Sequence, residues 1–164
     1  MGDFDPLRAL RVFIRHGVRF IVVGGMAGRV WGSPSITNDL DICYDRHRDN
    51  YEPLVAALQE LHATLRGAPA GLPFQLDVRT IELGDCFTFE TTAGPLDCLG
   101  TPAGTTGYID LAKNASKEEI GEGLVVLVTS LDDLLRMKRA AGRRKDLVEI
   151  EILSAVKEER ELES

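Results

Sequence analysis

Two aspartates, Asp39 and Asp41, stand two residues apart in a short segment of the chain. Leu40, Ile42 and Tyr44 alternate with them, which is the period-2 pattern of a β-strand. The pattern places both carboxylates on one face of that strand. Two carboxylates on one rigid face can hold Mg²⁺ and leave coordination positions open for water and phosphate oxygens.

A Gly-Gly dipeptide precedes the aspartates. Residues 20–23 are apolar, mostly β-branched or aromatic, and end at Gly24-Gly25, which predicts a buried strand that stops at a tight turn. Residues 26–31 leave room for a short helix before Gly32-Ser-Pro breaks it. Free backbone N–H groups at such a helix N-terminus suit a polyphosphate. Gly24 and Gly25 are therefore candidate nucleotide-binding residues.

Each feature alone has a simpler interpretation, a pair of surface aspartates and a turn that merely requires glycine. Their combination at this spacing favours a site for a triphosphate held between backbone amides and a metal. Such a site is arranged for in-line displacement at one phosphorus.

The same residues carry a resemblance. Gly24-Gly25, thirteen further residues and Asp39-Leu-Asp41 resemble the signature of the nucleotidyltransferase superfamily related to DNA polymerase β. Within it, Gly-Gly-Met-Ala, Gly32-Ser-Pro and Thr37-Asn-Asp-Leu-Asp-Ile resemble small bacterial nucleotidyltransferases of toxin–antitoxin systems, the MenT and AbiEii groups. One departure is Ser35, which stands where an Arg is common in those proteins, so a phosphate or substrate contact from that Arg is not expected here.

A third carboxylate, Asp97, lies in a predicted hairpin. Residues 87–92 and 95–99 read as its strands and Ala93-Gly94 as its turn. A carboxylate between apolar neighbours either faces outward or points to a site. In the resembled superfamily a third carboxylate lies on a later strand beside the first pair, and Asp97 matches that place. The resemblance implies that Asp97 binds the metal and helps to activate the attacking hydroxyl.

A basic stretch follows near the C-terminus, where six of the ten residues 136–145 are Lys or Arg. Such a run is usually a solvated helix end, where it also complements the helix dipole. Met-Lys-Arg-Ala-Ala-Gly-Arg followed by Lys-Asp-Leu, however, resembles the C-terminal motif of the same toxins. The resemblance implies that Lys138 contacts the nucleotide phosphates and that Asp146 helps to position the site. The candidates for RNA phosphate contacts are Arg139, Arg143, Arg144 and Lys145.

Thr37 lies two residues before Asp39, so on a strand it would share the carboxylate face, beside a bound nucleotide. Thr is also a good strand starter and it caps turns, which is the simpler interpretation. Some of the resembled toxins carry a phosphorylated Ser or Thr near this place, linked to silencing by a cognate antitoxin. The resemblance therefore implies regulatory phosphorylation of Thr37.

The remaining patterns predict a mixed α/β (α+β) fold, a small mixed sheet flanked by helices, in one domain over residues 1–164. We expect a sheet-containing catalytic core over about 1–129 and C-terminal helices over about 130–164. Residues 67–73 form a Pro/Gly loop, which is either an ordinary connector or a rim of the site. The other expected helices are 5–17, 51–65, 109–115, 130–142 and 147–161, and the other expected strands are 74–79 and 124–129.

Composition limits the protein class. The chain has 164 residues, of which 44% are hydrophobic, enough for one domain with a sizeable core. It has no run of eighteen apolar residues that would span a membrane, and Met-Gly-Asp-Phe-Asp is not the start of a signal peptide. Three widely spaced cysteines and three histidines without ligand spacing predict reduced, buried thiols rather than a zinc site, which suits a cytoplasmic protein. The net charge of −7 argues against general coating of nucleic acid.

The leading hypothesis is therefore an enzyme that transfers a nucleoside monophosphate from an NTP and releases pyrophosphate. By resemblance, the acceptor is the 3′ end of tRNA, the outcome is arrested translation, and a cognate antitoxin is a partner. An antibiotic nucleotidyltransferase is the alternative, but the basic stretch favours an RNA backbone over a cationic drug. A binding module of the same fold that has lost catalysis is less consistent with the presence of all three carboxylates.

Overall fold

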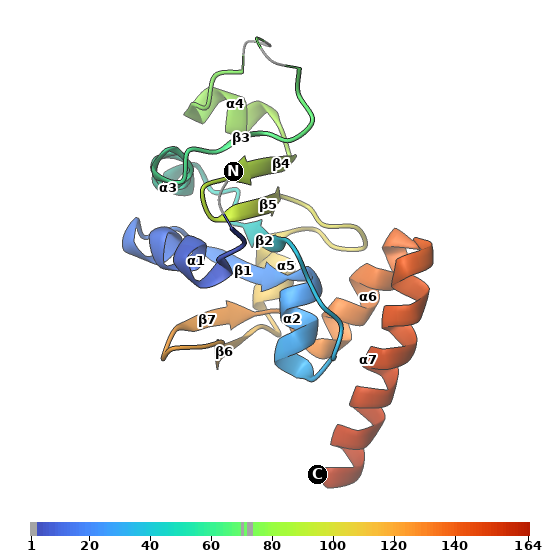
Figure 1. Cartoon of the computed structure of the whole chain (residues 1–164). Helices are drawn as coiled ribbons and strands as arrows, with labels where there is room; N and C mark the ends of the chain where they lie inside the picture. The colour runs from blue at the N-terminus through green and yellow to red at the C-terminus, as the bar shows by residue number, and fades with distance from the viewer. Residues whose placement is uncertain (1–2, 70, 72–73) are drawn as a thin grey trace.

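The computed structural model of the chain describes residues 3–69, 71 and 74–164. Within these residues, seven strands form one sheet in the order β3-β4-β5-β2-β1-β7-β6 (Figure 1). The strands are β1 (Phe20–Val23), β2 (Leu40–Tyr44), β3 (Thr64–Leu65), β4 (Cys86–Thr91), β5 (Gly94–Leu99), β6 (Ser116–Glu119) and β7 (Val125–Val128). The sheet mixes both strand directions, because β2 runs parallel to β5 and antiparallel to β1, which is itself parallel to β7. The expected mixed α/β fold is confirmed.

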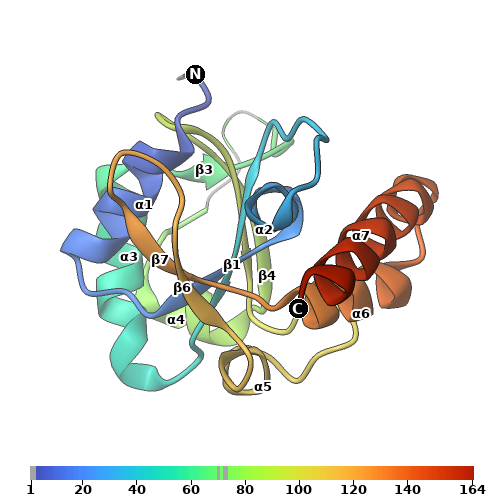
Figure 2. The same cartoon turned by 90° about the horizontal axis from the view of Figure 1, so that it is seen from below.

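Helices cover both faces of this sheet. Figures 1 and 2 show α1 and α3 on one side, and α2 with α6 and α7 on the other. All seven strands precede Ser130, and the two longest helices follow it. The helices are α1 (Pro6–Arg15), α2 (Gly24–Trp31), α3 (Tyr51–Glu60), α4 (Val78–Leu83), α5 (Tyr108–Ala112), α6 (Leu131–Ala141) and α7 (Arg144–Glu163), with the 3-10 turn η1 (Arg48–Asn50) before α3.

The helix ends follow the expected capping rules. Asp5 accepts a hydrogen bond from the backbone of Arg8, and Pro6 occupies the first turn of α1, where its missing N–H costs nothing. Ser130 accepts from the N–H of Asp133 at the start of α6. Gly142 ends α6 in the left-handed conformation at φ 64°, which glycine adopts without strain.

The core lies around the central strands. All four residues of β1 are buried, as is expected for a strand covered on both faces. Leu40, Ile42, Cys43 and Tyr44 of β2 are buried as well, with exposed fractions of at most 1%. The chain that surrounds Asp41 is therefore held on both sides by a packed interior, and this rigidity fixes the site.

Four expectations about elements are wrong at least in part. The alternation in residues 74–79 is not a strand: Asp77 caps the backbone N–H of Thr80 and starts α4. Helix α3 ends at Glu60, and Leu65 lies in the short strand β3. Strand β6 was not expected, because its sequence Ser-Lys-Glu-Glu is polar. Helix α7 begins at Arg144, three residues before the expected 147.

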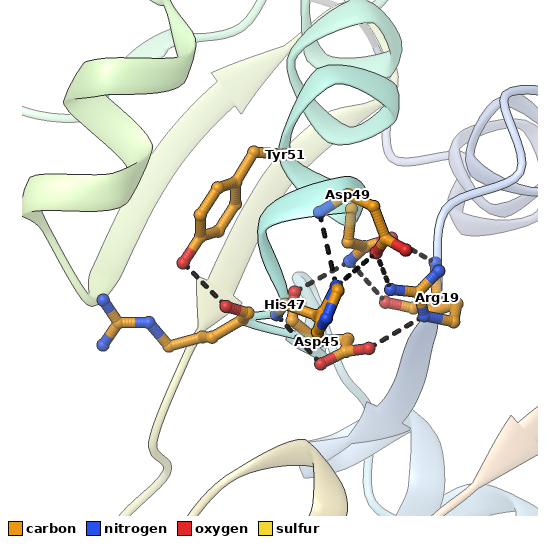
Figure 3. Close-up of polar contacts among 7 residues, drawn as sticks. Arg19, Asp45, His47, Asp49 and Tyr51 are labelled. Carbon is orange, nitrogen blue, oxygen red and sulfur yellow. Dashed lines mark hydrogen bonds and ion pairs between the residues drawn. The ribbon is translucent and has the colours of Figure 1, made fainter.

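A polar cluster fixes the sheet at the end of β2 that is remote from Asp41. Figure 3 shows Arg19 paired with Asp45 and Asp49, and His47 hydrogen-bonded to Asp49. The Tyr51 hydroxyl donates to the backbone carbonyl of Arg46 at 2.9 Å. His47 thus contributes to the turn before α3.

Two further expectations concern the thiols and the membrane. All three cysteines are free, but Cys86 is exposed while Cys43 and Cys98 are buried, so the expectation of burial holds for two of them. No helix in the described ranges is long and apolar enough to cross a membrane. Residues 70, 72 and 73 of the expected 67–73 loop lie outside the described residues.

Candidate active site

Three carboxylates meet at the centre of the sheet. Asp41 lies in β2, and Asp39 immediately precedes this strand. Asp97 lies in β5 as the register partner of Asp41, and register partners on adjacent strands point to the same face. One oxygen from each carboxylate lies within 4.8 Å of the others. The structure thus brings together the three predicted metal-binding residues.

The electrostatics of this triad are unfavourable without a cation. Burial raises the pKa of Asp41 to about 8; the charges of Asp39 and Asp97 add to the shift, and Lys138 opposes it. Oδ1 of Asp41 and Oδ1 of Asp97 are buried and accept no hydrogen bond within the described residues. Buried carboxylate oxygens without donors are costly.

These features fit a divalent cation. The three groups supply only oxygen ligands, and hard cations such as Mg²⁺ take a few carboxylates and complete their shell with water and phosphate oxygens. Two of the ligands have an oxygen that needs a partner. The residues that would hold the ion are Asp39, Asp41 and Asp97, the three carboxylates that the sequence analysis names as candidates.

The space beside the triad admits only glycine at positions 24 and 25. Gly24 has φ +66°, and a Cβ on it would lie 2.0 Å from Oδ2 of Asp41. A Cβ on Gly25 would lie 2.8 Å from the hydroxyl of Thr37. Helix α2 begins at Gly24, and no side chain of the described residues caps it. The uncapped N–H groups of an eight-residue helix therefore face the triad, as an anion site requires.

Thr37 contacts the first aspartate. Its hydroxyl lies 3.0 Å from the backbone carbonyl of Asp39 and 3.4 Å from the Asp39 carboxylate. Thr37 is partly buried and lines the larger of two cavities at the site. It lies outside β2, so its contact with Asp39 comes from the preceding loop rather than from strand periodicity.

The predicted pair Lys138 and Asp146 joins α6 to α7. The Asp146 side chain is fully buried, 3.7 Å from Nζ of Lys138. It also accepts hydrogen bonds from the backbone and the guanidinium of Arg143. Burial alone would raise the pKa of Asp146, but these hydrogen bonds and the charges of Arg143 and Lys138 outweigh it and lower the pKa. Asp146 is therefore an anionic anchor that holds both cations against the site.

The basic stretch divides into two groups. The first group forms ion pairs within the protein: Arg143 pairs with Asp146, and Arg136 pairs with both Asp110 and Asp133. The other group is exposed and forms no ion pair with the described part of the chain; it comprises Arg139, Arg144 and Lys145. Three of the four candidate RNA contacts are thus free cations at the corner between α6 and α7.

Two cavities open on the triad. The larger, about 700 Å³, is lined by all three carboxylates and by polar residues from four parts of the chain. The smaller, about 340 Å³, is lined mostly by apolar side chains. Asp41, Lys138 and Arg143 line both, so the two cavities meet at the triad.

Three residues of the larger cavity were not predicted from the sequence: Arg66, Glu90 and Glu149. Arg66 donates hydrogen bonds to Glu90 and to the carbonyl of Phe89. Its guanidinium lies 3.2 Å from Oδ1 of Asp97, but in an orientation that makes no hydrogen bond to that oxygen. Glu149 of α7 is the third residue. Each joins segments distant in sequence, so no local motif indicates it.

Glu149 also contacts the loop before β2, which includes Ser35. The hydroxyls of Ser33 and Ser35 both donate to its carboxylate. Ser35 therefore ties the loop before β2 to α7.

The fold is similar to solved nucleotidyltransferase structures. The crystal structure of the lincosamide antibiotic adenylyltransferase LnuA with lincomycin bound matches with a TM-score of 0.64 at 13% identity, over 94% of this chain and 99% of that chain. A presumed nucleotidyltransferase of Thermotoga maritima matches with a TM-score of 0.52 at 17% identity, over 89% and 91%. No protein-family model matches the sequence, and no curated protein does. The chain thus has the nucleotidyltransferase fold.

Proposed function

We propose that the protein is a metal-dependent nucleotidyltransferase that moves a nucleoside monophosphate from an NTP to an acceptor. One observation carries the proposal: Asp39, Asp41 and Asp97 converge beside the uncapped N-terminus of α2. An arrangement that only stabilised the fold would not leave two buried carboxylate oxygens without partners. The nucleotidyltransferase fold supports the proposal by analogy with other proteins of this fold.

Each residue has a role in the proposed reaction. The N–H groups at Gly24 and Gly25 and the ammonium of Lys138 bind the triphosphate. Asp146 keeps Lys138 oriented. A bound divalent cation, held by the triad, would supply charge neutralisation and a lowered hydroxyl pKa.

The acceptor hydroxyl approaches from the side of Asp97. Its oxygen forms a bond to the α-phosphorus, the bond from that phosphorus to the bridging oxygen breaks, and pyrophosphate leaves. Asp97 takes the hydroxyl proton as general base. The in-line geometry requires the leaving group to lie opposite the acceptor.

The proposed acceptor is the 3′ end of tRNA. The exposed cations Arg139, Arg144 and Lys145 support it, because Lys145 also lines the larger cavity and such groups bind nucleic-acid phosphates. A toxin role in the cytoplasm, with an antitoxin as partner, and Mg²⁺ as the natural metal belong to the same proposal.

A small-molecule acceptor is the second candidate. Two observations favour it: the likeness to an antibiotic adenylyltransferase over nearly its whole length, and the acidic residues Glu90 and Glu149 in the larger cavity. Acidic walls suit a cationic drug.

One experiment separates these functions. The protein is incubated with Mg²⁺ and each α-labelled NTP, with either total cellular RNA or lincomycin. Label at tRNA size supports the first function, and labelled lincomycin supports the second. The Asp41→Asn variant is the control and should transfer nothing. A wild-type protein that binds NTP and labels neither acceptor would favour a silent binding module.

A further inference from the structure

The smaller cavity differs in chemistry from the rest of the site. Away from the shared residues Asp41, Lys138 and Arg143, its walls come from the ends of β1 and β5, the loop after β5 and one face of α6, with Gly24 of α2 and Asp146 of α7. Its volume of about 340 Å³ lies in the range of small-molecule sites, roughly 300–1,000 Å³. Apart from Asp146, whose carboxylate is paired with Arg143 and Lys138, the side chains of this part are apolar: Val23, Leu99, Pro102, Ala103, Leu134, Met137 and Ala141.

The backbone of the loop that closes this cavity is also largely occupied. The carbonyl of Pro102 accepts from the N–H and the hydroxyl of Thr105, and a proline has no N–H to offer. The carbonyl of Gly104 accepts from Arg136 at 3.1 Å. Of the two loop residues that line the cavity, Pro102 has no free backbone group, and the N–H and carbonyl of Ala103 form no hydrogen bond with the described residues. The edge of a ligand would therefore meet one backbone unit here and no polar side chain of the loop.

The position of Asp97 indicates which cavity receives the acceptor and which receives the donor NTP. Asp97 lines only the larger cavity, whereas Gly24 lines only the smaller one. An acceptor hydroxyl that must reach Asp97 therefore enters through the larger cavity. The triphosphate lies at Gly24, Gly25 and Lys138, which border both cavities, since Gly25 lines only the larger one and Lys138 lines both. With the acceptor in the larger cavity, the nucleoside of the donor extends into the smaller one.

We propose that the smaller cavity binds the nucleobase of the donor NTP by shape and apolar contact, without side-chain hydrogen bonds to the base edge. This inference rests on the proposed function. Its consequence is broad donor use. Sites that hydrogen-bond a substrate group discriminate by about 10⁴–10⁵, whereas apolar pockets discriminate by only about 10–200-fold. The four NTPs should therefore bind with affinities that lie within that smaller range.

The test measures binding rather than turnover. Isothermal titration with Mg²⁺ compares non-hydrolysable analogues of the four NTPs with inorganic tripolyphosphate, which has no base. The variant Ala141→Leu narrows the cavity at the last turn of α6, and Leu keeps a high helix propensity. Ala112→Leu is the matched control, because Ala112 is exposed at the end of α5 and lines neither cavity.

In the wild type, all four analogues should bind more tightly than tripolyphosphate. Ala141→Leu should weaken every analogue at least about tenfold and leave tripolyphosphate unchanged, and Ala112→Leu should change neither. The inference is overturned if one NTP binds more than about 200-fold tighter than the others, or if Ala141→Leu weakens acceptor binding instead of NTP binding. If neither the analogues nor tripolyphosphate bind to the wild type, the proposed function itself fails.

Discussion

Asp41 and Asp97 are register partners on the parallel strands β2 and β5, although α3, α4 and a hairpin turn separate them in sequence. The sheet itself holds the two carboxylates together, because backbone pairing and core packing fix both strands. The repulsion between them cannot relax by movement of a loop. A divalent cation bound between the two carboxylates would relieve it.

Replacement of Asp41 by Asn should abolish nucleotidyl transfer and raise the thermal stability of the metal-free protein. Asn keeps the shape and cannot ionise, so the variant avoids the cost that burial and the charges of Asp39 and Asp97 impose on the Asp41 carboxylate, whose pKa they raise. Thermal melts in EDTA and Mn²⁺ titrations check both effects, with Glu151→Gln as the control, because Glu151 is exposed on α7 and forms no ion pair with the described residues. A variant with full activity would contradict the role of the triad.

The stability of the metal-free wild type should fall as the pH rises from about 4 to about 8. The folded state keeps a proton on Asp41, whose pKa rises from 3.8 to about 8, whereas the unfolded chain releases it near its ordinary pKa. The folded state thus binds more protons in this window, so stability decreases with pH. Denaturant titrations of wild type and Asp41→Asn at several pH values measure the difference, which should grow with pH. A constant difference would show that Asp41 is ionised throughout.

Arg66→Gln should bind divalent cations more tightly and melt at a lower temperature without them. The guanidinium partly neutralises Asp97, so its loss increases the repulsion in the empty triad and removes a competing cation. Arg79→Gln is the control, because Arg79 is exposed and has no ion pair with any described residue. Weaker Mn²⁺ binding in Arg66→Gln would mean that Arg66 positions Asp97 for the metal instead.

Combined replacement of Arg139, Arg144 and Lys145 by Gln should reduce RNA affinity and flatten its salt dependence. The logarithm of the association constant falls as the logarithm of the salt concentration rises, and each lost phosphate contact makes this slope shallower by about 0.7–0.9. Filter binding across a salt series measures the slope. Lys138→Ala should instead weaken NTP binding. An RNA affinity that does not depend on salt in the wild type would favour the small-molecule acceptor.

Thr37→Glu should impair NTP binding, and Thr37→Val should preserve most of it. We propose that phosphorylation of Thr37 inactivates the enzyme, because it adds about two negative charges beside Asp39 and competes for the donors of the triphosphate. The approach of the Thr37 hydroxyl to Gly25 leaves little room for a bulkier group. Normal binding and transfer by Thr37→Glu would leave Thr37 with a structural role only.

The sequence predicts the centre of this protein better than its edges. The apolar run before Gly24 and the alternation around Asp41 specify buried central strands, whose pattern is set by local burial. Strand β6 is polar, and β3 has only two residues; both form through pairing with a neighbour, which leaves little trace in the local pattern. The alternation at 74–79 was misleading because Asp77 caps a helix there.

The site shows the same division. Motifs predict Asp39, Asp41 and Lys138, since the chemistry requires them at fixed local spacing. Arg66 and Glu149 reach the site from distant segments, so only the fold reveals them. The split of the basic stretch was also not predictable, because Arg136 and Arg143 are recruited by the acids Asp110 and Asp146 through tertiary contacts.

The close approach of Gly24 to Asp41 has a consequence for the evolution of this protein. Any side chain at position 24 would meet the Asp41 carboxylate and would also have to adopt a left-handed backbone. A compensating change at position 41 would remove a metal ligand. A saturation library at position 24, selected for metal binding, should therefore return glycine alone. Single substitutions cannot replace Gly24 and then Asp41, in either order, without loss of the metal site at the first step.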